Sequence, residues 1–127
     1  MASVRLLGDA RRSIDAALEY TLARYGEEGV LQYAALITQA IDDFGAAPDA
    51  RTVRHLGKDR NGQDLLRYDL ALSRENVPKS VAKVANPRHF LVARLDGDLL
   101  RILFVAHDSM MPENVLGRAR HSDFKDD

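Results

Sequence analysis

Residues 10–44, ARRSIDAALEYTLARYGEEGVLQYAALITQAIDDF, decide the fold of this chain. Apolar side chains recur there at steps of three and four residues in two segments, residues 10–25 and 30–44, as in helices with one buried side. Gly26 follows the first segment and Gly45 the second, and glycine commonly ends helices. Because residues 26–28 are all that separates the two segments, the stretch predicts an antiparallel helical hairpin. The two apolar stripes are Ile14, Ala17, Leu18, Thr21, Leu22 and Tyr25, and Val30, Tyr33, Ala34, Ile37, Ile41 and Phe44.

Strand patterns lie on both sides of this hairpin. Residues 3–7 form a short candidate strand, and residues 64–72 alternate between apolar and polar, which predicts a strand with one buried face. Residues 88–95 and 99–106 flank Asp96-Gly97-Asp98, a strong turn signal. Their nearly continuous apolar runs place them at the centre of the sheet. Residues 45–63 and 73–86 are predicted to be connections.

A helical hairpin must bury its apolar stripe against another element, and only the sheet is available. We therefore expect a two-layer α+β fold with the element order β-α-α-β-β-β. Its small, mostly antiparallel sheet would carry the antiparallel helical hairpin on one face. We expect one domain over residues 1–116 and a flexible C-terminal tail over residues 117–127.

Composition narrows the possible functions. The chain has 127 residues, of which 46% are hydrophobic, as expected for one globular domain. It contains no cysteine, which excludes disulfides, a thiol nucleophile and a cysteine-based zinc site, and suits a reducing cytoplasm. No apolar run approaches the roughly 20 residues that span a bilayer, and the N-terminus lacks a signal-peptide pattern. We expect a cytoplasmic protein that does not bind membranes.

The spacing of the histidines and the distribution of charge limit the possible ligands and partners. His55, His89, His107 and His121 have no metal-ligand spacing, so we expect no metal, and no motif predicts another cofactor. Residues 51–101 carry 11 Lys and Arg against 6 Asp and Glu, although the whole chain has a formal net charge of −1. Such a basic middle segment indicates a solvated sheet face, or a site for nucleic acid or for an acidic partner.

Two segments resemble a known family. Residues 10–49 are similar to the start of ParE toxins, and the matching positions are Ile14, Leu18, Tyr20, Tyr25, Gly26, Tyr33, Ile41 and Pro48. The stretch PRHFLVARLDGDLLRILFVAHDSMMPENVL, residues 87–116, resembles the closing pattern of that family. Its matching positions are Pro87, Arg88, His89, Arg94, Arg101, Ile102, His107 and Met110. The resemblance covers residues 3–116. The chain departs from the pattern at Ala93, where an aromatic residue is usual, at Met111, where an acidic residue is usual, and in its longer segment 51–86.

The resemblance implies a RelE/ParE-like fold in a single toxin domain, residues 1–116. It implies the toxin of a bacterial type II toxin–antitoxin pair, which binds and poisons DNA gyrase and is neutralised by a ParD-like antitoxin. RelE-type members of the same superfamily cleave mRNA in the ribosome, so a ribosome-dependent mRNA endonuclease is the alternative, because fold alone does not decide function. A third possibility is an inactive toxin fold that only binds its antitoxin.

Each function selects its own candidate residues. A metal-free ribonuclease needs a base and cations near the phosphate, and direct nucleic-acid binding is expected only in that case. Its candidates are Arg88, His89, Arg94, Arg101 and His107. The sequence has no well-matched acid–base pair, which favours a toxin that is not an enzyme.

The same residues also have purely structural interpretations. Arg94 and Arg101 should face each other across the turn, where Asp69, Asp96 or Asp98 could neutralise them. His107 could equally be a neutral imidazole that ends a strand, and Tyr20, Tyr25 and Tyr33 are expected to pack in or around the core.

Two surfaces follow from the binding interpretation. The gyrase contacts would gather near one C-terminal edge, at Arg94, Arg101, His107, Met110 and Met111, since arginine and methionine are favoured contact residues. An exposed apolar groove on the central strands would receive the antitoxin, at Phe90, Leu91, Ile102 and Phe104. The basic segment 51–101 would meet an acidic antitoxin tail.

Overall fold

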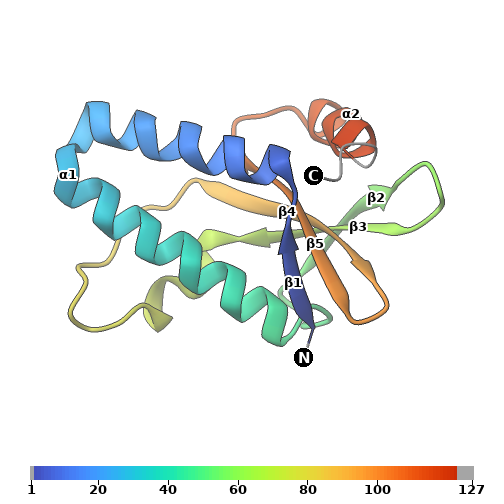
Figure 1. Ribbon diagram of the computed structural model, residues 1–127, viewed down its shortest axis with the longest axis horizontal. Helices are drawn as coiled ribbons and strands as arrows, with labels where there is room; N and C mark the ends of the chain where they lie inside the picture. The colour runs from blue at the N-terminus through green and yellow to red at the C-terminus, as the bar shows by residue number, and fades with distance from the viewer. Residues whose placement is uncertain (1, 123–127) are drawn as a thin grey trace.

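A five-stranded mixed sheet organises the molecule, for which a computed structural model describes residues 2–122 (Figure 1). The strand order is β1-β5-β4-β3-β2, with β1 parallel to β5 and the other pairs antiparallel. The α+β class and the central position of the two apolar strands are therefore confirmed. The strands are β1 (Ser3–Leu6), β2 (Arg54–Lys58), β3 (Asp64–Asp69), β4 (His89–Asp96) and β5 (Leu99–His107). The helices are α1 (Gly8–Ala46), the 3-10 helix η1 (Leu70–Asn76) and α2 (Pro112–Ser122).

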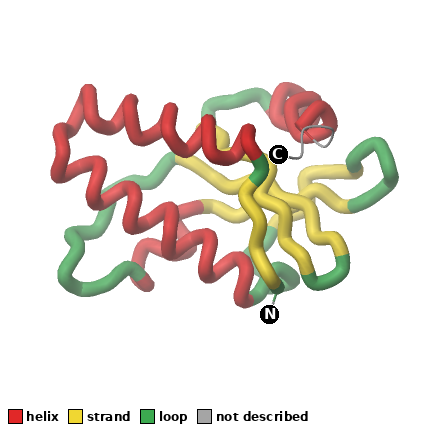
Figure 2. Tube along the Cα trace, viewed as in Figure 1, coloured by secondary structure: helices red, strands yellow, loops and turns green. Residues whose placement is uncertain are grey.

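The helical hairpin is present within α1, which turns back on itself at Gly26 (Figure 2). Gly26 has φ 75° and ψ −171°, a conformation that is essentially confined to glycine. Three residues later the chain passes close to itself, because a Cβ on Gly29 would lie 2.6 Å from the Cβ of Tyr25. One glycine therefore makes the turn and the other permits the close approach beside it.

The second arm of α1 packs on one face of the sheet. Leu36, Ile37 and Phe44 are buried there with Leu91 and Ile102 of the central strands. A buried hydroxyl also links η1 to α1, because the Ser73 hydroxyl donates to Asp43 across 2.7 Å. The predicted packing of the hairpin on the sheet is thus confirmed.

The opposite face of the sheet is covered as well, which corrects the expectation of a helix layer on one side only. Val115 and Ala119 of α2 are buried against Phe90 and Phe104. In addition, the guanidinium of Arg67 lies 3.7 Å from the ring centroid of Phe90, and that of Arg118 lies 4.2 Å from Phe104.

The exposed apolar groove predicted for the antitoxin is therefore wrong. Phe90, Leu91, Ile102 and Phe104 are all buried, with at most 1% of their surface exposed. Successive strand residues point to opposite faces, and each face has its own helix, so all four side chains belong to the core.

Three further boundaries differ from the sequence prediction. Strand β2 was missed inside a predicted connection, and β3 ends at Asp69 instead of residue 72 because residues 70–76 form η1. Residues 117–122, assigned to a flexible tail, complete α2. Residues 123–127 of that tail lie outside the described residues. Over residues 2–122, no helix combines the length and apolar character needed to cross a membrane.

Candidate functional site

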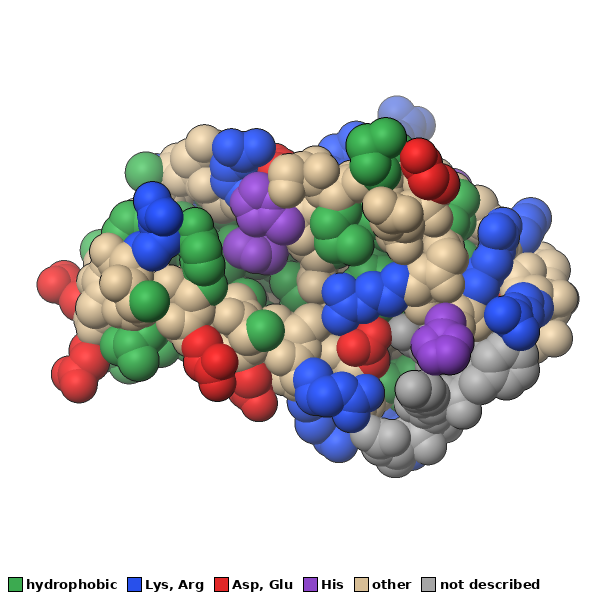
Figure 3. Space-filling view, turned by 90° about the horizontal axis from the view of Figure 1, so that it is seen from above, with side chains coloured by type: hydrophobic (Ala, Val, Ile, Leu, Met, Phe, Trp, Pro, Cys, Tyr) green, Lys and Arg blue, Asp and Glu red, His purple; other side chains and the backbone are tan. Residues whose placement is uncertain are grey.

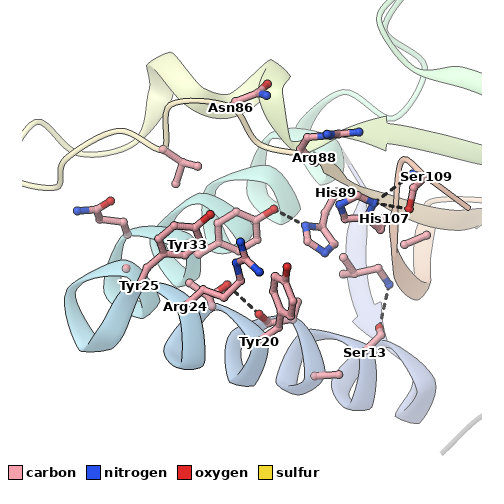
Figure 4. A pocket seen from close by; sticks show the side chains of 18 of the residues that line it. Ser13, Tyr20, Arg24, Tyr25, Tyr33, Asn86, Arg88, His89, His107 and Ser109 are labelled. Carbon is pink, nitrogen blue, oxygen red and sulfur yellow. Dashed lines mark hydrogen bonds between the residues drawn. The ribbon is translucent and has the colours of Figure 1, made fainter.

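A cleft of about 1080 Å³ opens between the first arm of α1 and the open end of the β4–β5 hairpin. Its third wall is the loop that leads into β4, residues 84–88. Figure 3 shows the face into which the cleft opens, with histidine side chains beside the hollow. At the floor, the backbone N–H of Val105 donates to the Ser13 hydroxyl across 2.9 Å, which ties α1 to β5 (Figure 4). The cleft walls are thus held by elements of the rigid core.

Two histidines lie side by side in this cleft. His89 begins β4 and His107 ends β5, and the antiparallel register pairs them directly. Their ring centroids are 5.0 Å apart, with the rings nearly perpendicular. Both side chains lie on the α1 face, in step with Leu91 and Val105 of the core. The pairing follows from hairpin register, which the sequence alone did not specify for these two positions.

His89 is held in its neutral form. Its Nδ1 lies 2.5 Å from the Tyr33 hydroxyl. Burial and the neighbouring His107 lower the pKa of His89 to about 4, although Asp108 opposes this shift. Burial also raises the pKa of Tyr33 to about 12, against a smaller lowering by the backbone amides of Arg88 and His89. Because Tyr33 keeps its proton, we assign its hydroxyl as donor to Nδ1 and the ring proton of His89 to Nε2.

His107 has the same tautomer for a different reason. The backbone N–H of Ser109 donates to His107 Nδ1 across 3.1 Å, and the Ser109 hydroxyl lies 2.8 Å from the same nitrogen. A nitrogen that accepts a backbone N–H carries no proton of its own, so the ring proton lies on Nε2. Both histidines therefore present N–H donors with their remaining nitrogen.

Arg88 is fixed beside the histidine pair. Its Nε and one terminal nitrogen bind both carboxylate oxygens of Asp108, at 2.9 to 3.1 Å. This hydrogen-bonded pairing raises the pKa of Arg88 and lowers that of Asp108. The guanidinium therefore remains charged, but its charge is balanced by a carboxylate.

Aromatic side chains of α1 form the wall opposite the histidines. Tyr20 and Tyr25 are 57% and 67% exposed, so the prediction that they pack around the core is only partly right. Tyr33, in contrast, is a core residue. The Arg24 guanidinium lies 5.4 Å from the Tyr20 ring centroid, and hydrogen bonding to Tyr25 raises its pKa. In Figure 4, Tyr20 and Arg24 rise from the helix toward the histidine side of the cleft.

Arg94 and Arg101 lie elsewhere, so the predicted gathering with His107 at one edge is wrong. They do pair across the β4–β5 turn, as expected, and both bind Asp96. Arg94 also binds Asp59, whose side chain is fully buried. Arg101 lies six strand positions from His107, about 20 Å away, and Arg94 and Arg101 point to the α2 face. The β4–β5 hairpin thus places the two arginines near its turn and the two histidines at its open end.

The two methionines take different positions near the cleft. Met110 lines the cleft and packs against the core under α2, whereas Met111 is 55% exposed at the start of α2. Of the predicted target contacts, His107, Met110 and Met111 therefore belong to one region. Of the predicted ribonuclease residues, Arg88, His89 and His107 meet there.

Sequence reasoning missed Arg24, Asp108 and Ser109. Two local signals were available, since Asp108 and Ser109 directly follow His107, and Arg24 is one helical turn from Tyr20. Across residues 2–122, no group of three potential ligands is placed to hold a metal ion.

Comparison with known proteins gives no match for this chain, either among protein-family models or among curated proteins.

Proposed function

We propose that this chain is the toxin of a bacterial type II toxin–antitoxin pair, acts by binding DNA gyrase, and is neutralised by a ParD-like antitoxin. The proposal includes a RelE/ParE-like fold and a cytoplasmic location. Its support is the resemblance of residues 3–116 to ParE toxins, together with an α+β architecture in which a helical hairpin packs on a small sheet.

The hydrogen bonds of the two cleft histidines favour a role in binding over a role in catalysis. In both rings Nδ1 is engaged, by Tyr33 in His89 and by Ser109 in His107, and the proton lies on Nε2. A general base needs a free ring nitrogen, and a general acid needs a proton that it can give up near neutral pH. With a pKa of about 4, His89 provides neither, which supports a role for its Nε2–H as a hydrogen-bond donor to a bound surface.

The proposed contact surface is the cleft rim at His107, Met110 and Met111. These residues combine a donor with polarizable apolar groups, a pairing suited to a protein partner. Arg94 and Arg101 are left out because they lie on the other face and are bound to carboxylates.

Growth arrest on expression tests the proposal in cells. We expect wild type to arrest growth and Met111→Glu to relieve the arrest at matched soluble levels, because a charge there opposes docking of an apolar partner. Two variants serve as controls and should stay toxic. Leu31→Glu changes an exposed apolar residue on the second arm of α1, and Arg101→Ala changes the other face of the sheet. Relief of toxicity by Arg101→Ala but not by Met111→Glu would move the contact surface to the arginine face.

A ribosome-dependent mRNA endonuclease is the second candidate, favoured by the meeting of Arg88, His89 and His107 in one cleft. Mapping of mRNA cleavage on ribosomes with the purified chain distinguishes the two. We expect no cleavage. Cleavage that is lost in His107→Gln, with supercoiling by gyrase unaffected, would establish the endonuclease in place of the gyrase toxin.

A further inference from the structure

One cation in the cleft differs from the others. Three arginines line the cleft, and two of them are bound by carboxylates, Arg88 by Asp108 and Arg118 by Asp9 at 3.1 and 3.2 Å. Arg24 instead lies over the Tyr20 ring, with its guanidinium carbon 5.4 Å from the ring centroid, and the neighbouring tyrosines Tyr25 and Tyr20 raise its pKa. Within residues 2–122, no carboxylate lies within salt-bridge distance of Arg24. Its positive charge is thus available to an anionic ligand.

The groups around Arg24 suit a planar ring next to an anion. Tyr20 presents an exposed aromatic face, on which a flat heterocycle can stack. His89 and His107 line the same cleft, and anionic oxygens are the strongest acceptors for their Nε2–H groups. Figure 4 shows Tyr20 and Arg24 on the α1 wall, directed toward the histidine pair.

We propose that this cleft binds a free nucleoside phosphate. The base stacks on Tyr20, and the phosphate is held by Arg24 and by the N–H donors of His89 and His107. This inference goes beyond the proposed gyrase binding and does not depend on it, since its test contains no gyrase.

A single nucleotide fits the charges better than a nucleic-acid strand does. A strand-binding groove needs a row of available cations that follows successive phosphates. Among the described residues that line the cleft, one arginine is such a cation, because the carboxylates of Asp108 and Asp9 already balance Arg88 and Arg118. The volume of about 1080 Å³ lies just above the usual range for small-ligand pockets, so the cleft has room for one nucleotide.

Calorimetric titration of the full chain with AMP, adenosine and inorganic phosphate tests the proposal. We expect AMP to bind. Adenosine and inorganic phosphate should each bind at least tenfold more weakly, because adenosine lacks the phosphate and inorganic phosphate lacks the base. UMP should bind within about fivefold of AMP, because stacking tolerates different bases. Arg24→Gln and Tyr20→Leu should each weaken AMP binding at least fivefold. The matched controls Arg11→Gln and Leu22→Ala, exposed residues of the same helix outside the cleft lining, should leave it unchanged.

Three results would overturn the proposal. The first is that the folded chain does not bind AMP at millimolar concentration. The second is that AMP binds equally well to Arg24→Gln and Tyr20→Leu. The third is that the chain binds a single-stranded oligonucleotide but not AMP. The last result would instead favour the endonuclease candidate. Thermal melts of each variant establish that the chain is folded in every titration.

Discussion

At the scale of single residues, the cleft is defined by how its two histidines are hydrogen-bonded. Tyr33 fixes one ring from the helical hairpin, and Ser109 fixes the other from the turn after β5. Neither ring needs to gain a proton to offer its Nε2–H.

The pKa of His89 gives a prediction about stability. A histidine in the unfolded chain has a pKa of about 6.5, whereas His89 in the folded chain has a pKa of about 4. The unfolded state therefore takes up more protons between these two pH values. The contribution of neutral His89 to the free energy of unfolding should be fully present above pH 6.5 and should be lost as the pH falls toward 4. We expect a loss of about 1–2 kcal/mol, allowing for solvent screening of the partly exposed ring.

Urea unfolding of wild type and His89→Gln from pH 7.5 to pH 4 isolates this contribution, because the carboxylates titrate in both proteins. The free energy of unfolding should fall more steeply with decreasing pH in the wild type than in His89→Gln. Equal slopes, or an NMR titration of the His89 ring with a midpoint near 6.5, would contradict the assignment.

Residue-level prediction succeeded in finding candidates and failed in grouping them. His89, His107 and Arg88 were selected from strand ends, where side chains often reach a shared edge. The set nevertheless mixed them with Arg94 and Arg101, although the predicted turn at residues 96–98 already placed those two arginines at the opposite end of the hairpin. Once the register is known, residue 89 pairs with 107 and residue 94 with 101, and the separation follows.

At the scale of elements, the helical hairpin depends on its two glycines. Gly26 has a backbone conformation that other residues adopt only with strain, although no atom within 4 Å would obstruct a side chain there. Backbone geometry therefore opposes the replacement of Gly26 by another residue. Lack of space opposes the replacement of Gly29, since its Cβ would overlap Tyr25.

Gly26→Ala should accordingly destabilise the chain by about 1–3 kcal/mol, the usual cost of such a backbone conformation. Gly117→Ala is the control, because Gly117 lies in α2 with open space around it and alanine favours helices. It should be neutral or stabilising by up to about 1 kcal/mol. Chemical denaturation measures both changes. An unchanged midpoint for Gly26→Ala would show that the turn tolerates another conformation.

Elements with strong periodicity were predictable, and elements specified by tertiary contacts were not. The two arms of α1 and strands β4 and β5 carry clear patterns in the sequence. Strand β2 has the sequence RHLGK, with little alternation and a register shift before Gly57, and it forms because β3 pairs with it. Helix α2 covers the second face through Val115, Ala119 and the Arg118–Asp9 pair, none of which gives a strong local signal.

At the scale of the whole molecule, two helical layers enclose the sheet, and stability depends on both. Ile37 is buried between the second arm of α1 and the sheet. Ile37→Asp should cost several kcal/mol, because an unpaired carboxylate would be buried, and this is comparable to the total stability of such a domain. The neighbouring exposed position gives a matched control, Thr38→Asp, which should fold normally. Thermal melts followed by circular dichroism compare the two. A normal midpoint for Ile37→Asp would contradict the packing of α1 on the sheet.

Association with the proposed antitoxin gives a prediction about salt. The basic segment, residues 51–101, should attract an acidic antitoxin tail, so the association rate should fall clearly as ionic strength rises. Stopped-flow mixing of the chain with its antitoxin between about 50 and 500 mM salt measures this effect. A rate that does not change with salt would remove the electrostatic part of the proposal.

The central claim is that the cleft rim binds DNA gyrase, and inhibition of supercoiling tests it most directly. Purified chain is titrated into gyrase, relaxed plasmid and ATP, together with His107→Leu and the control Arg101→Ala. We predict that wild type and Arg101→Ala inhibit supercoiling at similar concentrations. His107→Leu should need at least tenfold more protein, because it loses the Nε2–H donor. Supercoiling that continues unchanged with a stoichiometric excess of folded wild-type protein would contradict the claim.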